Sequence, residues 1–262
     1  GSGVAIDAGA DNSAAVTFSG TLAQLNAALN GLTYVGNNDF HGSDNLQIQI
    51  NDLGETGAGS GLTDSATVAL TINPVNDTPV VTAPVATQNA TEDVDFDFGA
   101  TVSFADVDET LTPGLDHRVT LAVGQGILTL GTTAGVDIVG GADGSATVTI
   151  EGTLAELNTA VTNLTYRGNL NYNGADTLTV TLNDKGNTGS DPGTSGDGSS
   201  EQHEVTVNID VAAVNDNPDA VNDTGTIDED TLLTVAANGL LGNDSDLDGD
   251  GFTVTDFDGN GS

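Results

Sequence analysis

The chain has 262 residues and carries 39 acidic against three basic side chains, which gives a formal net charge of −36 at pH 7. A charge of that sign and size repels nucleic acid and anionic membrane surfaces, so neither is expected as a partner. The chain has no cysteine, which excludes disulfides and thiolate metal sites, and no run of about 20 apolar residues of the kind that a membrane-spanning helix requires.

A short helix is the first element that the sequence predicts. Over residues 22–32 leucine recurs at a helical spacing of three and four, and residues 154–164 repeat the pattern. Thr21 and Gln24 form a capping box, in which each side chain satisfies a free backbone N–H, and the second copy has an equivalent pair. Each helix has one apolar face, so we expect it to cover one end of a β-sandwich.

Strand patterns account for most of the remaining apolar residues. Period-two alternation predicts strands over 46–50, 68–72, 178–182 and 205–209. Thr, Val and Ile are frequent in these runs, and Gly, Asn and Asp mark the turns. Short strands at this spacing predict an all-β chain of antiparallel β-sandwich modules, each with one short helix.

The chain is internally repeated. Residues 3–57 and 135–189 align without a gap, and 30 of the 55 aligned positions are identical. Self-similarity of this kind is typical of arrays of modules. Such arrays usually serve as extensions, spacers or adhesive segments rather than as enzymes. We therefore expect the C-terminal part of a repeat over 1–77, a complete repeat over 78–218 and the N-terminal part of a further repeat over 219–262.

Acidic and amide side chains gather around the module boundaries. Alternate residues of an extended strand point the same way, so an Asp-x-Asp pair can offer two carboxylates to one ion. Calcium takes about six to eight oxygen ligands, which carboxylate and amide groups supply. We predict calcium sites at the junctions, with eleven candidate ligands: Asn76, Asp77, Glu92, Asp106, Asp108, Asp184, Asn215, Asp216, Glu229, Asp244 and Asp246.

A second calcium motif can be weighed in the last of these acidic runs. Asp244, Asp246, Asp248 and Gly249 begin as an EF-hand loop begins. The twelfth position of that loop is Thr255, where an EF-hand requires a bidentate glutamate. We therefore do not interpret the run as an EF-hand.

The order of the motifs resembles the cadherin repeat: a glutamate, then Ala/Asn-Asp-x-Asp, a strand ending in Asp-x-Gly, and finally Asn-Asp-x-x-Pro. The run Gly-Thr-Leu-x-x-Leu-Asn … Leu-Thr-Tyr … Asn-Asp-x-Gly is similar to the cadherin-like, chondroitin-sulphate-proteoglycan type repeats of giant bacterial adhesins. Residues 228–250 resemble another cadherin-like repeat of the same proteins. The resemblance implies an RTX-class adhesin that is secreted by a type I system and acts at the bacterial cell surface.

The resemblance also implies how the ligands group. At the first junction it places Glu92, Asp106 and Asp108 with Asn76 and Asp77. At the second junction the corresponding set is Glu229, Asp244, Asp246, Asn215 and Asp216.

No catalytic constellation is recognisable. His41, His117 and His203 have no neighbour at metal or triad spacing, and Gly-x-Ser-x-Gly, phosphate-loop and His-Glu-x-x-His motifs do not occur. Aromatic residues make up 4% of the chain, which is too few for the sugar platforms that usually accompany a glycosidase carboxylate pair. We therefore expect no enzyme.

The sequence thus predicts calcium-binding extender modules of a large extracellular adhesin, which serve cell adhesion or biofilm attachment. Calcium and the neighbouring modules of the same chain are the expected partners, and a surface glycan or protein would be bound by other domains. Two alternatives remain open. One is a module that itself binds a ligand such as a glycan, a host protein or ice, and the other is an accessory domain of a secreted polysaccharide-degrading enzyme.

Overall fold

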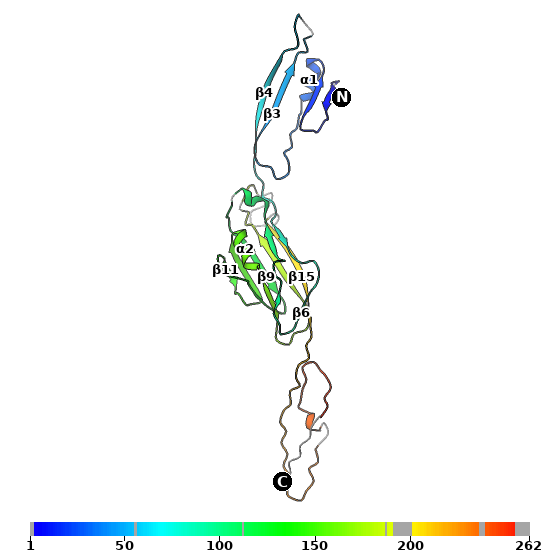
Figure 1. Ribbon diagram of the computed structural model, residues 1–262, viewed down its shortest axis with the longest axis vertical. Helices are drawn as coiled ribbons and strands as arrows, with labels where there is room; N and C mark the ends of the chain where they lie inside the picture. Colours follow the sequence, from blue (N-terminus) through cyan, green and yellow to red (C-terminus); the bar gives the residue numbers. More distant parts are fainter. Residues whose placement is uncertain are drawn as a thin grey trace. The chain divides into compact units, whose positions relative to one another are not determined.

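The computed structural model describes residues 3–54, 57–111, 113–186, 188–190, 201–235 and 239–254. The chain divides into two compact units, Gly1–Pro74 and Val75–Ser262. Strands dominate the described residues, which also contain two short α-helices, α1 (Leu22–Leu29) and α2 (Leu154–Val161) (Figure 1). The expected all-β, sandwich-type fold is confirmed.

The larger unit is built on a six-stranded sheet with the strand order β11-β12-β9-β14-β15-β6. Its strands are β6 (Gln88–Thr91), β9 (His117–Val123), β11 (Asp137–Gly141), β12 (Thr147–Gly152), β14 (Gly174–Asn183) and β15 (Gln202–Ala212). Neighbouring strands are antiparallel except β15 and β6, which run parallel with Ile209 opposite Gln88. Buried and more exposed residues alternate along the central strands, so one face of the sheet packs on the core and the other faces solvent.

Two smaller sheets accompany the large one, with the strand orders β10-β13-β7 and β5-β8. Their strands are β5 (Val80–Thr82), β7 (Phe96–Asp97), β8 (Ser103–Ala105), β10 (Gly126–Thr129) and β13 (Thr165–Gly168). Leu121 and Leu178 of the large sheet join Leu128 and Tyr166 of the small ones in a single buried cluster. This shared core holds the layers together as a sandwich.

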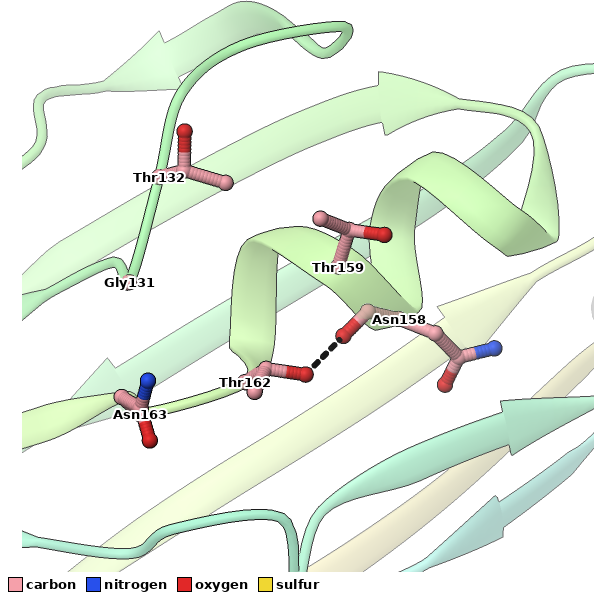
Figure 2. A pocket seen from close by; sticks show the side chains of 6 residues that line it. All are labelled: Gly131, Thr132, Asn158, Thr159, Thr162 and Asn163. Atoms are coloured by element: carbon pink, nitrogen blue, oxygen red, sulfur yellow. Dashed lines mark hydrogen bonds between the residues drawn. The ribbon is translucent and has the colours of Figure 1, made fainter.

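Helix α2 is capped at its N-terminus and is bound to the sandwich through Asn158. The predicted capping box is confirmed, because Thr153 Oγ1 accepts from the backbone of Glu156 and the Glu156 carboxylate accepts in return from the backbone of Thr153. Further along, Asn158 bonds the backbone of Phe104 in β8 through both atoms of its amide. Figure 2 shows the C-terminal turn, where Thr162 Oγ1 donates to the Asn158 carbonyl over 2.9 Å. The helix therefore covers β8, as its one-sided apolar pattern suggests.

The smaller unit repeats these elements. It contains β1 (Ala5–Gly9), β2 (Val16–Ser19), helix α1 with its own capping box, β3 (Gly42–Asn51) and β4 (Thr63–Ile72). β1-β2 and β3-β4 form separate two-stranded sheets here, whereas their counterparts in the larger unit are joined through β9. Among the described residues of this unit, no strand corresponds to β9.

Beyond residue 218, where the complete repeat is expected to end, the described part of 219–254 has little regular structure. It contains one 3₁₀ turn, η2 (Gly239–Leu241), and one isolated bridge between Asp219 and Ser245. Among the described residues, no helix is long and apolar enough to cross a membrane.

Candidate metal centre

Three carboxylates meet where the chain leaves the complete repeat. Glu92, Asp216 and Asp248 each place one oxygen within 4.8 Å of the others, and in the described part of the chain this is the one cluster of its kind. Carboxylates so close together repel one another unless a cation lies between them. The oxygen-only donor set suits a hard divalent ion such as calcium.

The parallel pairing of β6 with β15 positions Glu92. The ladder continues one residue past β6, where the Glu92 amide donates to the Ala212 carbonyl over 3.0 Å. This carries the buried Glu92 side chain to the exit end of β15, where one carboxylate oxygen accepts from the backbone of Val214 and the other from Asn173 Nδ2. Both oxygens are therefore aimed and largely desolvated before any ion arrives.

Asp216 supplies the observation that points most directly to a ligand. Its backbone N–H donates to Asp248 Oδ2 over 2.6 Å, which draws the two side chains together. Its own Oδ2 is buried and has no hydrogen-bond partner. Burial, followed by the charges of Asp248, Glu92, Asp93 and Asp246, raises the pKa of Asp216 above its ordinary value. A buried, unsatisfied carboxylate oxygen among like charges is what a cation would complete.

Asp246 organises the loop that presents Asp248. Its Oδ1 accepts from the backbone of Asp248 over 3.0 Å and from that of Asp250 over 3.2 Å. Asn215 closes the opposite side by donating from Nδ2 to the Asp216 carbonyl over 3.1 Å. The residues present thus fit a calcium ion: Glu92, Asp216 and Asp248 would hold it, while Asp246 and Asn215 position them.

A second acidic cluster repeats part of this arrangement at the other end of the β14–β15 hairpin. The Asp77 amide donates to Asp108 Oδ2 over 2.7 Å, and the Asp108 amide donates to Asp106 Oδ1 over 2.8 Å. This relay matches the one that joins Asp216, Asp248 and Asp246. The two ends of the complete repeat therefore use the same backbone-to-carboxylate relay.

In this second cluster, neighbouring protein groups offset part of the negative charge of the carboxylates. Asn76 Nδ2 donates to Asp184 Oδ2 over 3.1 Å, and His117 Nε2 lies 3.2 Å from Asp106 Oδ2. Burial alone lowers the pKa of His117, but the hydrogen bonds to Asp106 and the Leu115 carbonyl and the nearby acidic charges outweigh it and leave that pKa raised. A protonated His117 offsets the negative charge here, whereas Glu92, Asp216 and Asp248 have no such neighbour among the described residues.

The structure divides the predicted ligands differently from the expected grouping. Asn76, Asp77, Asp106, Asp108 and Asp184 do come together. Glu92 does not join them, because its strand pairs with β15 in parallel and carries it to the opposite end of the repeat.

The second set is also corrected. The relay makes Asp246 and Asp248, rather than Asp244 and Asp246, the counterparts of Asp106 and Asp108. Asp244 instead accepts from the backbone of Val221 over 2.8 Å. Glu229 is exposed in the turn before Thr231, and no contact with the cluster is recorded for it. Asn215 and Asp216 lie where they were expected.

Three participants were missed from the sequence. Asp248 was considered only as part of an EF-hand loop, which was rejected, and Asn173 carries no motif at all. His117 has no ligand-like neighbour in sequence, and it reaches Asp106 only because β9 and the 3₁₀ turn η1 (Val107–Thr110) are adjacent in space. A further buried acid, Glu201, lies at the Asp184 end, where its carbonyl accepts from the Asp184 amide over 2.9 Å.

Comparison with protein families gives a match for the segment that follows β15, which carries part of the cluster. Residues 214–262 match the cadherin-like domain. That stretch carries Asn215, Asp216, Asp246 and Asp248, so the cadherin-like resemblance read from the motifs is supported there. Residues 1–57 match a second family, the Protein GAMETE EXPRESSED 2 domain. The comparison with curated proteins gave no match.

Among solved structures, the chain is similar to two from an S-layer protein. One is "Crystal structure of the S-layer protein SbsC domains 4 and 5", with 17% identity over 66% of this chain and 59% of that chain and a TM-score of 0.22. The other is "Structure of surface layer protein SbsC, domains 1-6", with 15% identity, coverage of 68% and 18%, and a TM-score of 0.21. The chain thus spans less than two thirds of either structure, and likeness at this level carries no functional argument.

Proposed function

We propose that this chain is a calcium-binding extender segment of an extracellular surface adhesin, without catalytic activity of its own. The observation that carries the proposal is the buried, unpartnered Oδ2 of Asp216 between the carboxylates of Glu92 and Asp248. An ion held there would be ligated by Glu92 at the end of β6, by Asp216 after β15 and by Asp248 in the loop of the next repeat. It would therefore link these three segments.

The expected effect is mechanical. Without an ion, the carboxylates repel and the segment after Ala212 is free to bend; with an ion, three segments far apart in sequence share one bound charge. Binding to the folded chain alone also stabilises it by mass action, because the unfolded chain does not assemble the same set of oxygens. Stiff junctions would let an array hold a distal binding domain away from the cell.

Calcium titration calorimetry on the full chain, combined with thermal unfolding in calcium and in chelator, tests the proposal. We expect saturable binding and a higher unfolding temperature in calcium. Glu92→Gln should weaken that binding by about tenfold or more, whereas Glu229→Gln, the exposed residue once expected to be its counterpart, should leave it unchanged. Equal losses in the two variants, or an unfolding temperature indifferent to chelator, would overturn the proposal.

A further inference from the structure

A groove of about 510 Å³ lies on the solvent face of the six-stranded sheet, at the end where β14 begins and β15 finishes. Its floor comes from two strands that pair in antiparallel register, with Thr177 opposite Asn208 and Ala175 opposite Asp210. These side chains are all exposed. Residues opposite one another on a sheet have Cβ atoms about 5 Å apart, so the hydroxyl, amide and carboxylate groups project side by side.

The polar groups on this floor are available. In the part of the chain that the structure describes, the side chains of Asn208, Asp210 and Thr177 make no hydrogen bond, so they present donors and acceptors to a ligand in the groove. Asp176, which also borders the groove, is not available. Its carboxylate already accepts from the amides of Gly124 and Gln125 over 2.9 Å each.

The wall of the groove is held in place before any ligand binds. Asp176 fixes the turn that carries Gln125, as described. Tyr172, which also lines the groove, donates its hydroxyl to the Ala175 carbonyl over 2.6 Å, and this bond holds the side chain in place. The residues on either side of Tyr172 are also anchored, since Asn171 donates its amide to Asp93 and Asn173 donates to Glu92. A pre-formed wall lowers the ordering cost of binding.

We propose that this groove binds a neutral glycan. Hydroxyl, amide and carboxylate groups beside one aromatic ring match a ligand that presents hydroxyl groups on its edges and C–H groups on its faces. An anionic glycan is disfavoured, because the groove contains Asp210 and the chain carries a net charge of −36.

The first repeat lacks the amide and the carboxylate that Asn208 and Asp210 present on β15, although its strands align with those of the second and an aromatic ring is kept. Opposite Asn45, the counterpart of Thr177, stands Ala69, and opposite Ser43, the counterpart of Ala175, stands Thr71. The position of Tyr172 is taken by Phe40. The exposed Asn208 and Asp210 side chains thus have no equivalent at the aligned positions of the smaller unit, which offers an internal control.

A second hollow on this repeat, beside α2, is a poorer candidate. It is lined by Gly131, Thr132, Asn158, Thr159, Thr162 and Asn163 (Figure 2). The Asn158 amide is consumed by bonds to Phe104 and Leu154, and the Thr159 and Thr162 hydroxyls bond to helix carbonyls. Its polar groups are therefore mostly committed, and it has no aromatic ring.

Saturation-transfer NMR on the full chain in calcium-containing buffer tests the proposal. The probes are cellohexaose, maltohexaose, laminarihexaose, mannohexaose and galactohexaose as neutral glycans, with hexaguluronate as the anionic comparison. We expect at least one neutral hexasaccharide to bind, and amide shifts on titration to cluster at Tyr172, Thr177 and Asn208. If no neutral probe binds, or only the hexaguluronate does, the proposal is wrong.

Variants locate the binding site. Asn208→Ala combined with Asp210→Ala changes two exposed side chains and should lower affinity about tenfold or more. Tyr172→Leu should also weaken binding, while Tyr172→Phe should retain most of it because the ring remains. Asn45→Ala, in the first repeat, is the matched control and should have no effect. Undiminished binding by the Asn208/Asp210 double variant would overturn the assignment. None of these substitutions removes a carboxylate of the calcium cluster, so a failure here is distinguishable from a failure of the calcium proposal.

Discussion

The hydroxyl of Tyr166 donates a hydrogen bond of 2.9 Å to the carboxylate of Asp176 inside the sandwich. The same pair recurs in the smaller unit, where Tyr34 donates to Asp44 over 2.6 Å. In the complete repeat both partners are buried, whereas Tyr34 is 44% exposed. One conserved contact thus exists in two environments within a single chain, which allows its energetic contribution to be measured against burial.

Tyr166→Phe should therefore destabilise the chain more than Tyr34→Phe. Losing the Tyr166 hydroxyl leaves the buried Asp176 carboxylate short of a donor, at an expected cost of about 1–3 kcal/mol. In the smaller unit, water can replace the lost hydrogen bond to Asp44, so Tyr34→Phe should change the free energy of unfolding little. Urea unfolding followed by circular dichroism measures both variants, and equal effects would contradict the role assigned to burial.

Alkaline pH should act on the same pair. Burial, with the Asp176 hydrogen bond, raises the pKa of Tyr166 above its ordinary value of 10.0. A group whose pKa is raised by folding contributes stability that is present below the unfolded pKa and lost as the pH rises above it. The free energy of unfolding should fall above about pH 10, and Tyr166→Phe should reduce that slope. A slope that the substitution leaves intact would assign the loss to other groups.

Asp216→Asn should change stability in opposite directions with and without calcium. In chelator the substitution removes a buried charge from among like charges, so the unfolding temperature should rise. In calcium it removes a ligand oxygen, so the unfolding temperature should fall. Thermal unfolding in the two buffers decides the matter, and a shift of the same sign in both would argue against an ion at this position.

Acidic pH should weaken a contact in which two of the chain's three basic side chains converge. Glu151 accepts from Arg118 over 2.7 Å and lies 2.9 Å from Lys185 Nζ. The hydrogen bond from Lys185, supported by Arg118, lowers the pKa of Glu151 below its ordinary value of 4.5. The resulting stability is present above that value and is lost as the pH falls through the lowered pKa.

The pairs on Glu151 are partly exposed, so their contribution should stay below about 1 kcal/mol. Glu151→Gln should remove that part of the acid dependence in a pH series of urea unfolding curves. Glu204→Gln, a change at an exposed position of strand β15, serves as the control. An acid slope unaltered by Glu151→Gln would show that the two cations do not act through this carboxylate.

Gly131→Ala should be strongly destabilising. The added Cβ would lie 1.7 Å from the Thr162 carbonyl oxygen, so helix α2 or β10 would have to move. Overpacking of this kind typically costs about 1–3 kcal/mol. Gly251→Ala, where the new methyl group meets open space, is the control in the same unfolding measurement. A neutral Gly131→Ala variant would indicate that α2 lies further from this loop.

The helices and the acidic character of the module ends could be predicted from sequence because their causes are local. Thr153 and Glu156 satisfy each other within one turn, and the Asn-Asp pairs at 76–77 and 215–216 stand at the expected boundaries. The position of Glu92 could not be predicted, because it depends on a parallel pairing between strands separated by more than a hundred residues.

The counterparts of Asp106 and Asp108 were predicted wrongly for a different reason. In the run 244–250 an aspartate stands at every second position, so shifts of two residues look alike in sequence. Only the amide of Asp216, which selects Asp248 as its acceptor, distinguishes them. The glycan groove is likewise invisible in sequence, since Thr177 and Asn208 become neighbours only through strand register.

The parallel pairing of β6 with β15 has a consequence for a chain under tension. A pull toward the N-terminus draws β6 along its axis in one direction, and a pull toward the C-terminus draws β15 in the other. The hydrogen bonds between the two strands are then loaded together in shear rather than opened one after another like a zip. Glu92, which bonds the backbone of Val214 just past the last rung, adds to this clamp at the point where the load enters.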